Sequence, residues 1–165
     1  MKKFLLPIAV TVLVACNNSE NSTTTTTDSS DKKMNHDSMP QMTTAVPDLP
    51  AVPEGAKVSF VNLKNDQSVT SPFKVDMAVD GMKIDTAGPV VAASGHFHIL
   101  IDQDAFPEGQ MIPKDSLHLH YGKGQTTDNV KLSPGIHKLT IQFADGAHRS
   151  YGSKLATSIN VNVKK

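Results

Sequence analysis

The chain has 165 residues, and its 16 Lys and Arg balance 16 Asp and Glu, so it carries no formal net charge. Balanced charge without a block of basic residues excludes the electrostatic footprint of a nucleic-acid-binding protein. Cysteine occurs once, so an intramolecular disulfide framework is excluded as well.

The first residues have the pattern of a secretory signal. A basic start at residues 1–3 precedes an apolar run over residues 4–15, which is shorter than the about 20 residues of a membrane-spanning helix. The motif LVAC at residues 13–16 resembles the lipobox of bacterial lipoproteins. This resemblance implies a signal peptide over residues 1–15 and lipid on Cys16. The alternative is an ordinary signal peptide with an incidental cysteine.

A lipidated Cys16 would be a membrane anchor. Acyl chains hold a soluble domain at a membrane surface, and Asn17 after the cysteine favours the outer membrane of the cell envelope, facing the periplasm or the cell surface. With Cys16 acylated, no thiol remains for catalysis or metal binding. Any metal site must then use nitrogen, oxygen or thioether sulfur.

Residues 16–52 predict a disordered, lipid-anchored tether, because they are rich in Ser, Thr, Asn, Asp and Pro. Three methionines and a histidine fall within nine residues of it. Thioether sulfur suits Cu(I), so copper capture is one interpretation of this segment, and a solvated linker is the other. The residues concerned are Met34, His36, Met39 and Met42.

Residues 53–165 predict one small domain. Apolar residues recur at period two, as in Phe73, Val75, Met77 and Val79, and no long 3.6-residue stripe occurs. Short strands separated by Asn-Asp, Pro-Gly and Asp-Gly turns, with no crossover helix, predict an antiparallel immunoglobulin-like β-sandwich. The predicted strands, about seven in number, cover residues 57–63, 73–79, 96–102, 117–121, 130–132, 138–143 and 155–163.

Four of the seven histidines form two His-x-His units, HFH at residues 96–98 and HLH at residues 118–120. Side chains alternate across a strand, so the apolar residues between and beside the histidines predict that the histidines face away from the core. The apolar sets are Phe97, Ile99 and Ile101 in the first strand, and Leu117, Leu119 and Tyr121 in the second.

A metal site follows if the two strands are neighbours, joined through residues 103–116. Opposed residues then have Cβ atoms about 4.5–5.5 Å apart, and three or four imidazoles can reach one ion of copper or zinc. The predicted ligands are His96, His98, His118 and His120. Asp102 is a further candidate ligand, or a group that orients a histidine. The alternative is that these are surface or hydrogen-bonded structural histidines.

The remaining histidines have other expected roles. His137 follows Pro134-Gly135, where we expect a hydrogen bond at a strand corner. His148 lies in a turn, where it either reaches the histidine patch, as a ligand or as a second group around it, or is solvated. No nucleophile elbow or phosphate loop is found.

The chain resembles the bacterial domain of unknown function family numbered 4399 over roughly residues 58–163. The motifs that carry the resemblance are SGHFHILID at residues 94–102, HLHYGKGQT at residues 118–126 and LSPGIHKL at residues 132–139, with Asp145 and His148 later. The resemblance implies a secreted or lipid-anchored envelope domain. This chain departs from the family in having Phe97 where a third histidine is usual, and Arg149-Ser150-Tyr151-Gly152 where a proline-rich stretch is usual.

Three functional hypotheses follow. The first is a non-enzymatic, lipid-anchored envelope domain that binds copper or zinc. The second is a metal-free interaction module, whose histidine face with Lys123 and Gln125 binds a protein or glycan. The third, a metal-dependent enzyme, ranks last, because Asp102 is its only candidate acid or base.

Overall fold

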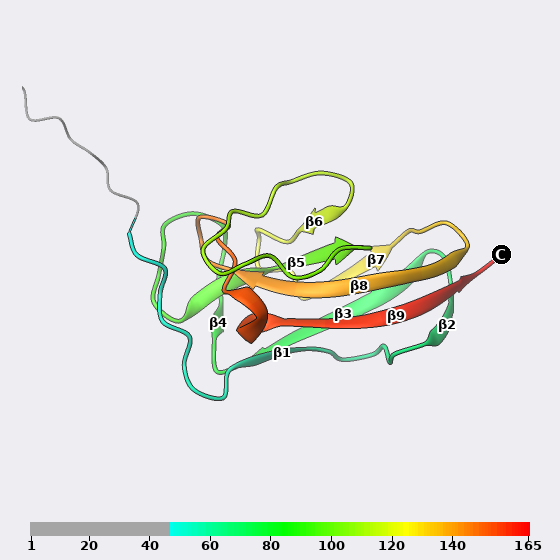
Figure 1. Cartoon of the computed structure of the whole chain (residues 1–165), viewed down its shortest axis with the longest axis horizontal. Coiled ribbons are helices and arrows are strands. Elements are labelled where there is room, and N and C mark those ends of the chain that lie inside the picture. Colours follow the sequence, from blue (N-terminus) through cyan, green and yellow to red (C-terminus); the bar gives the residue numbers. More distant parts are fainter. Residues whose placement is uncertain (1–46) are drawn as a thin grey trace, which may run out of the picture. The chain divides into compact units, whose positions relative to one another are not determined.

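Nine strands and one 3-10 helix make up residues 47–165, the part of the chain that the computed structural model describes (Figure 1). The strands are β1 (Lys57–Phe60), β2 (Gln67–Thr70), β3 (Phe73–Asp80), β4 (Lys83–Ile84), β5 (Ser94–Ile101), β6 (His118–His120), β7 (Thr127–Val130), β8 (Gly135–Ala144) and β9 (Ala156–Lys164), and the helix η1 covers Gly152–Leu155. The predicted signal peptide, Cys16 and the Met34, His36, Met39 and Met42 cluster lie outside the described residues.

The strands form two sheets, in the order β1-β3-β7 and β2-β9-β8-β5-β4, with β6 paired to β5. Figure 1 shows β5, β8 and β9 running beside one another, with β1 and β3 in the other sheet. The prediction of an all-β, sandwich-like fold is confirmed. Two pairings are parallel rather than antiparallel, β2 with β9 and β4 with β5. The sequence did not reveal β2 and β4, because a four-residue and a two-residue strand are too short to establish an alternation.

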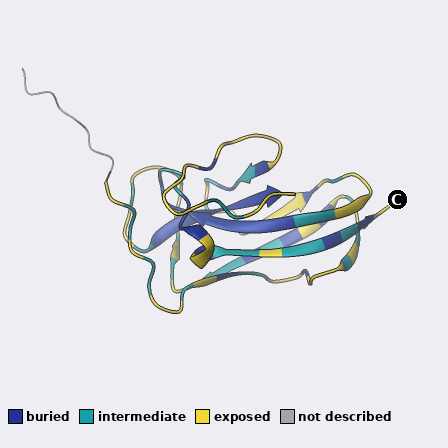
Figure 2. Cartoon of the chain, viewed as in Figure 1, coloured by how far each residue is buried: buried dark blue, intermediate teal, exposed yellow. Residues whose placement is uncertain are grey.

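The main core lies between the sheets. The predicted face of Phe73, Val75 and Met77 on β3 is buried, as are Phe97 and Ile99 on β5. Figure 2 shows burial concentrated along β5 and β8. Leu117 is an exception to the predicted apolar set, with 42% of its surface exposed. It precedes β6, which is only three residues long, and so it lies outside the paired strand.

A second, smaller apolar cluster covers the opposite face of β5. It consists of Leu100, Ile112 and Ala144, with Phe106 packed against it. The segment between β5 and β6 is held over this face by hydrogen bonds at Phe106, whose N–H donates to Gln142 Oε1 and whose carbonyl accepts from Ser150 Oγ. All eight residues of β5 are therefore buried, and the face that carries His96 and His98 is covered rather than open to solvent.

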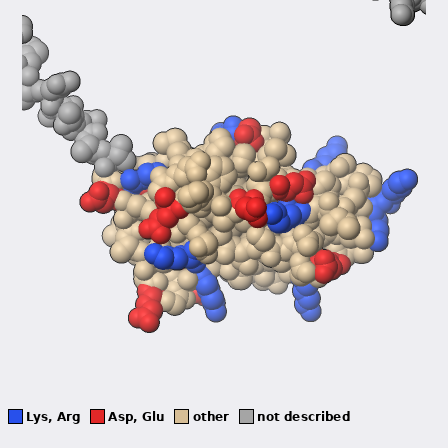
Figure 3. Space-filling model, in the orientation of Figure 1, with Lys and Arg blue, Asp and Glu red and all other residues tan. Residues whose placement is uncertain are grey.

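The packed chain begins a few residues before the predicted boundary at residue 53. Leu49 and Val52 pack against the main core, and the carbonyl of Pro47 accepts a 2.7 Å hydrogen bond from Arg149 Nη1. Figure 3 shows acidic and basic side chains interspersed on the face drawn. Within residues 47–165, no helix is long and apolar enough to cross a membrane.

Candidate metal centre

Two neighbouring strands bring the His-x-His units together. β5 and β6 pair antiparallel, with His98 directly opposite His120, which confirms the predicted adjacency. Alternation along β5 sends Phe97 and Ile99 into the main core. It therefore directs His96 and His98 to the other face of the sheet.

Four imidazole rings lie close together on this face. The ring centroid of His96 is 5.0–5.1 Å from those of His98, His120 and His148, and those of His120 and His148 are 4.7 Å apart. Nitrogens of His96, His98 and His120 all lie within 4.8 Å of one another. We call these four residues the histidine cluster. They come from β5, from β6 and from the turn that follows β8.

The ring nitrogens of the cluster converge in pairs. The Nε2 atoms of His96 and His98 are 3.1 Å apart, and those of His120 and His148 are 3.0 Å apart. Metal–imidazole bonds of about 2.0–2.1 Å place ligand nitrogens about 3.3 Å apart in a tetrahedron and about 2.9 Å apart in a square plane. The separations within each pair lie between these values, whereas the nitrogens of His96, His98 and His120 as a set lie within 4.8 Å of one another, so binding of one ion would bring the two pairs closer together.

His96 and His98 have few hydrogen bonds for buried polar residues. Neither is exposed to solvent, and among the described residues each Nδ1 atom is buried without a hydrogen-bond partner. A buried polar atom without a partner costs about 1–3 kcal/mol. The converging ligand atoms would be Nε2, so the unpaired Nδ1 atoms do not themselves indicate a ligand-binding role, and the case for one rests on the convergence of the rings.

Burial keeps the imidazole rings of His96, His98 and His120 neutral near pH 7. Burial, and after it the rings of His148 and His120, lowers the pKa of His96 to about 4. Burial and the neighbouring histidines lower the pKa of His98 to about 2, and burial also lowers the pKa of His120. A neutral imidazole has the lone pair that binds a metal. His96, His98 and His120 therefore offer unprotonated nitrogens to a cation near neutral pH.

The structure does not bring His118 into the cluster. His118 lies opposite Leu100, two pairs further along β5 than His98. Its Nδ1 atom is 2.7 Å from Asp115 Oδ1, and its ring packs edge-on against Phe106. The predicted group of four thus changes at one position, because His148 lies beside the other three rings instead.

Asp102 also lies apart from the cluster. Its Oδ2 atom is 2.9 Å from Nδ1 of His137, and its Oδ1 atom accepts the backbone N–H of Lys138. Nε2 of His137 is 3.0 Å from the carbonyl oxygen of Ser133, so the predicted strand-corner hydrogen bonding of His137 is confirmed. We call Asp102, Ser133 and His137 the His137 corner.

A family model supports the resemblance found in the sequence. The model of a domain of unknown function, DUF4399, matches residues 75–164. The chain belongs to this family. The matched segment of the DUF4399 domain contains the whole histidine cluster and the His137 corner. No curated protein and no solved structure matches the chain.

The sequence alone did not identify the groups that make room for the cluster. A Cβ atom on Gly122 would overlap the ring of His120, so the glycine after HLHY lets that ring turn over the strand end. Gly146 likewise approaches the backbone at Gly88 and Pro89 too closely for a side chain. The motif H-x-H-x-G was a visible signal for the first position, whereas the second depends on a contact with a distant loop.

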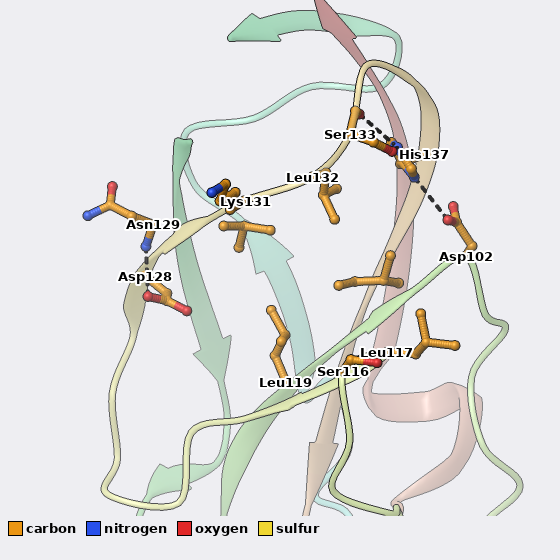
Figure 4. Close-up of a pocket in the computed structure, with 12 residues that line it drawn as sticks. Asp102, Ser116, Leu117, Leu119, Asp128, Asn129, Lys131, Leu132, Ser133 and His137 are labelled. Atoms are coloured by element: carbon orange, nitrogen blue, oxygen red, sulfur yellow. Dashed lines mark hydrogen bonds and ion pairs between the residues drawn. The ribbon is translucent and has the colours of Figure 1, made fainter. Parts of the chain in front are cut away.

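A separate pocket of about 470 Å³ lies between β6 and β7 and includes the His137 corner (Figure 4). In this corner the ring of His137 lies between the Ser133 hydroxyl and the Asp102 carboxylate, an arrangement that resembles a hydrolase triad. However, Nε2 of His137 lies nearer to the Ser133 carbonyl, at 3.0 Å, than to its hydroxyl, at 3.4 Å. A carbonyl oxygen only accepts, so a proton on Nε2 is directed to it. The ring is therefore paired more closely with the backbone of the corner than with the hydroxyl.

Proposed function

We propose that this DUF4399 protein binds one copper or zinc ion through His96, His98 and His120, without catalysing a reaction. The observation that carries the proposal is the convergence of three imidazoles within 4.8 Å of one another, two of them fully buried. Imidazole is a good ligand for both Cu(II) and Zn(II). The identity of the ion is part of what the experiment below measures.

Burial favours this proposal over the interaction module. A partner protein or glycan needs accessible contact groups, whereas His96 and His98 are not exposed. Lys123 and Gln125 are exposed, but Gln125 Oε1 accepts the backbone N–H of Lys123 within the same turn. The hydrogen-bonding capacity of these two residues is thus partly used inside the loop.

The test is a titration of the full-length chain carrying Cys16→Ser, which removes the only thiol. After treatment with a chelator, the chain is titrated with Cu(II), Cu(I) and Zn(II) in the presence of competing chelators of known affinity. We expect one ion per chain and micromolar or tighter binding. A His98→Ala variant should lose at least about 100-fold in affinity, in line with the loss of a ligand.

The matched control is His118→Ala, which removes a histidine of the same motif outside the cluster. It should bind with an affinity within a few-fold of the parent chain. Absence of stoichiometric binding by the parent chain would contradict the proposal, and equal losses in both variants would contradict the choice of ligands.

We further propose that lipid on Cys16 anchors the domain in the cell envelope, and that Met34, His36, Met39 and Met42 help to capture Cu(I). The lipobox-like motif and the soft thioether donors support these proposals. The wild-type chain expressed in a bacterial host should be found with the membranes and the Cys16→Ser chain should not. Replacing the three methionines by leucine should weaken Cu(I) binding alone and leave Zn(II) binding unchanged.

A further inference from the structure

The turn after β8 carries a histidine in an unusual backbone conformation. His148 has a φ of 66°, in the left-handed region, which a few per cent of non-glycine residues adopt. Conformations of this kind persist where the surrounding structure over-determines them, often at ligand sites. The position of the His148 imidazole therefore helps to decide whether the residue belongs to a ligand site.

The ring of His148 points into the histidine cluster. Its Nε2 atom is 3.0 Å from Nε2 of His120, and its centroid is 5.0 Å from that of His96 and 5.9 Å from that of His98. Among the described residues, His120 is the side chain to which His148 is hydrogen-bonded. The ring nitrogen of His148 thus lies beside that of His120, one of the three histidines whose nitrogens lie within 4.8 Å of one another.

A buried carboxylate holds the turn in this shape. Asp145 is fully buried, and its carbonyl accepts the backbone N–H of His148. Its Oδ1 atom accepts the backbone N–H of Arg149, and its Oδ2 atom accepts Nε and Nη2 of the Arg149 guanidinium at 2.8 and 2.7 Å. The residue after His148 is therefore bonded to the Asp145 side chain, and His148 itself is bonded to the Asp145 backbone carbonyl.

Contacts from outside the turn complete the support. The backbone N–H of Ile112 donates to the carbonyl of His148 at 2.9 Å, and the N–H of Gly88 donates to the carbonyl of Gly146 at 2.9 Å. Since the turn is bonded on three sides, the histidine ring is presented to the cluster before any ion arrives. Such preorganisation reduces the ordering that binding requires.

We propose that His148 is the fourth metal ligand and that Asp145 is the positioning residue that holds it, an inference that rests on the proposed metal binding. Four imidazoles complete a four-coordinate site. Closed sites of this kind hold an ion, whereas catalytic sites keep a position open for water or substrate. The proposal therefore assigns the domain to metal storage or carriage rather than to metal-dependent hydrolysis.

Cobalt(II) tests the coordination directly, because a tetrahedral Co(II) centre absorbs visible light far more strongly than a five- or six-coordinate one. The full-length Cys16→Ser chain loaded with Co(II) should give the intense spectrum, and added azide should not change it. His148→Ala should give a weaker spectrum that responds to azide, and added imidazole should restore the parent spectrum. His118→Ala is the matched control and should behave as the parent.

Asp145→Asn tests the positioning role in a double-mutant cycle. Alone, it should weaken Zn(II) binding by about 10-fold, the lower end for groups that orient ligands. Combined with His148→Ala, it should cause no further loss, because it acts through His148. Equal losses in both backgrounds would reduce Asp145 to a structural role and overturn that part of the proposal.

The outcomes separate the two levels of inference. If His148→Ala keeps the parent's Co(II) spectrum, azide response and Zn(II) affinity, His148 is not a ligand and this inference fails while the three-histidine site stands. If the folded parent binds none of Co(II), Zn(II) or Cu(II), the proposed function fails and this inference fails with it. Thermal unfolding of each variant without metal identifies any that do not fold.

Discussion

The histidine cluster and the His137 corner show two different uses of buried or half-buried imidazole in one small domain. His137 has a carboxylate on one ring nitrogen and a carbonyl oxygen on the other. His96 and His98 have only each other and the neighbouring rings, and their Nδ1 atoms are unpaired among the described residues. Satisfied hydrogen bonds indicate a histidine that supports the fold. Three imidazoles whose nitrogens lie within 4.8 Å of one another are instead close enough to hold a metal ion.

The largest difference between the two regions should appear when metal is added. A ligand at about 1,000 times its Kd stabilises a protein by about 4 kcal/mol, which corresponds to a rise in Tm of more than about 10 °C for a domain of this size. We expect such a rise with Zn(II) for the parent chain and for His137→Ala. The rise should vanish in His98→Ala, as measured by differential scanning calorimetry.

A shift of equal size in His98→Ala would contradict the assignment. Such a result would mean that the stabilising ion binds elsewhere in the chain.

The second-largest effect should be the loss of stability that the histidine cluster causes in the metal-free protein as the pH falls. Below a pH of about 6.5 the unfolded chain protonates His96 and His98, whereas the folded chain resists, because their pKa values are lowered to about 4 and about 2. The unfolded state therefore binds more protons, and stability falls as the pH falls. From pH 7 to pH 5 we expect a loss of roughly 3–4 kcal/mol in the free energy of unfolding, about 2 from each ring.

Urea unfolding with a chelator present, repeated across this pH range, measures that loss. The carboxylates whose pKa values are lowered, at Asp76, Asp102 and Asp115, titrate below this window. A free energy of unfolding that stays flat from pH 7 to pH 5 would mean that the folded cluster accepts protons as readily as the unfolded chain.

Replacing His137 in the His137 corner should reduce the stability of the fold and leave metal affinity unchanged. His137→Ala removes a ring that lies 2.9 Å from Asp102 Oδ2 and 3.0 Å from the Ser133 carbonyl oxygen, and a neutral imidazole donates a proton to one of these two acceptors. Because Asp102 is about half exposed, water replaces part of what is lost. We expect a loss of about 1–2 kcal/mol in the free energy of unfolding and an unchanged Zn(II) affinity. An affinity that falls together with stability would link the corner to the cluster.

The smallest effect should follow His118→Ala. Its partner Asp115 is half exposed, and pairs of this kind contribute little, so the change removes mainly packing against Phe106. We expect a loss of about 1 kcal/mol in a urea titration. A larger effect on metal affinity than that of His120→Ala would restore the sequence-based choice of His118 over His148.

The sequence predicted much of this architecture because its signals are local. Alternation in β3, β5 and β8 depends on the two-residue repeat of a strand, so the faces of Phe73, Val75 and Ile99 could be assigned from the chain alone. Leu117 was assigned wrongly to the core because β6 begins only after it. The short strands β2 and β4 were not predicted, because their residues show no clear alternation and the strands form only by pairing with β9 and β5.

The candidate site was predicted in part for the same reason. HFH and HLH, each within an apolar alternation, were enough to place His96, His98 and His120 on one face. The choice between His118 and His148 was not available from the sequence, because it depends on which residue stands opposite His98 and on where the turn 28 residues after His120 directs the ring of His148. Register and turn geometry are settled by hydrogen bonds between distant segments.

By itself, the sequence determined most of the strand faces and the presence of two His-x-His units that turn away from the core, because these follow from residue type and spacing. Only the tertiary structure decided that the histidine face is covered, that His120 opposes His98, and that Asp145 directs His148 toward them. Coordination is a matter of distances of a few ångströms between segments far apart in the chain. Such distances exist only once the sheets have packed.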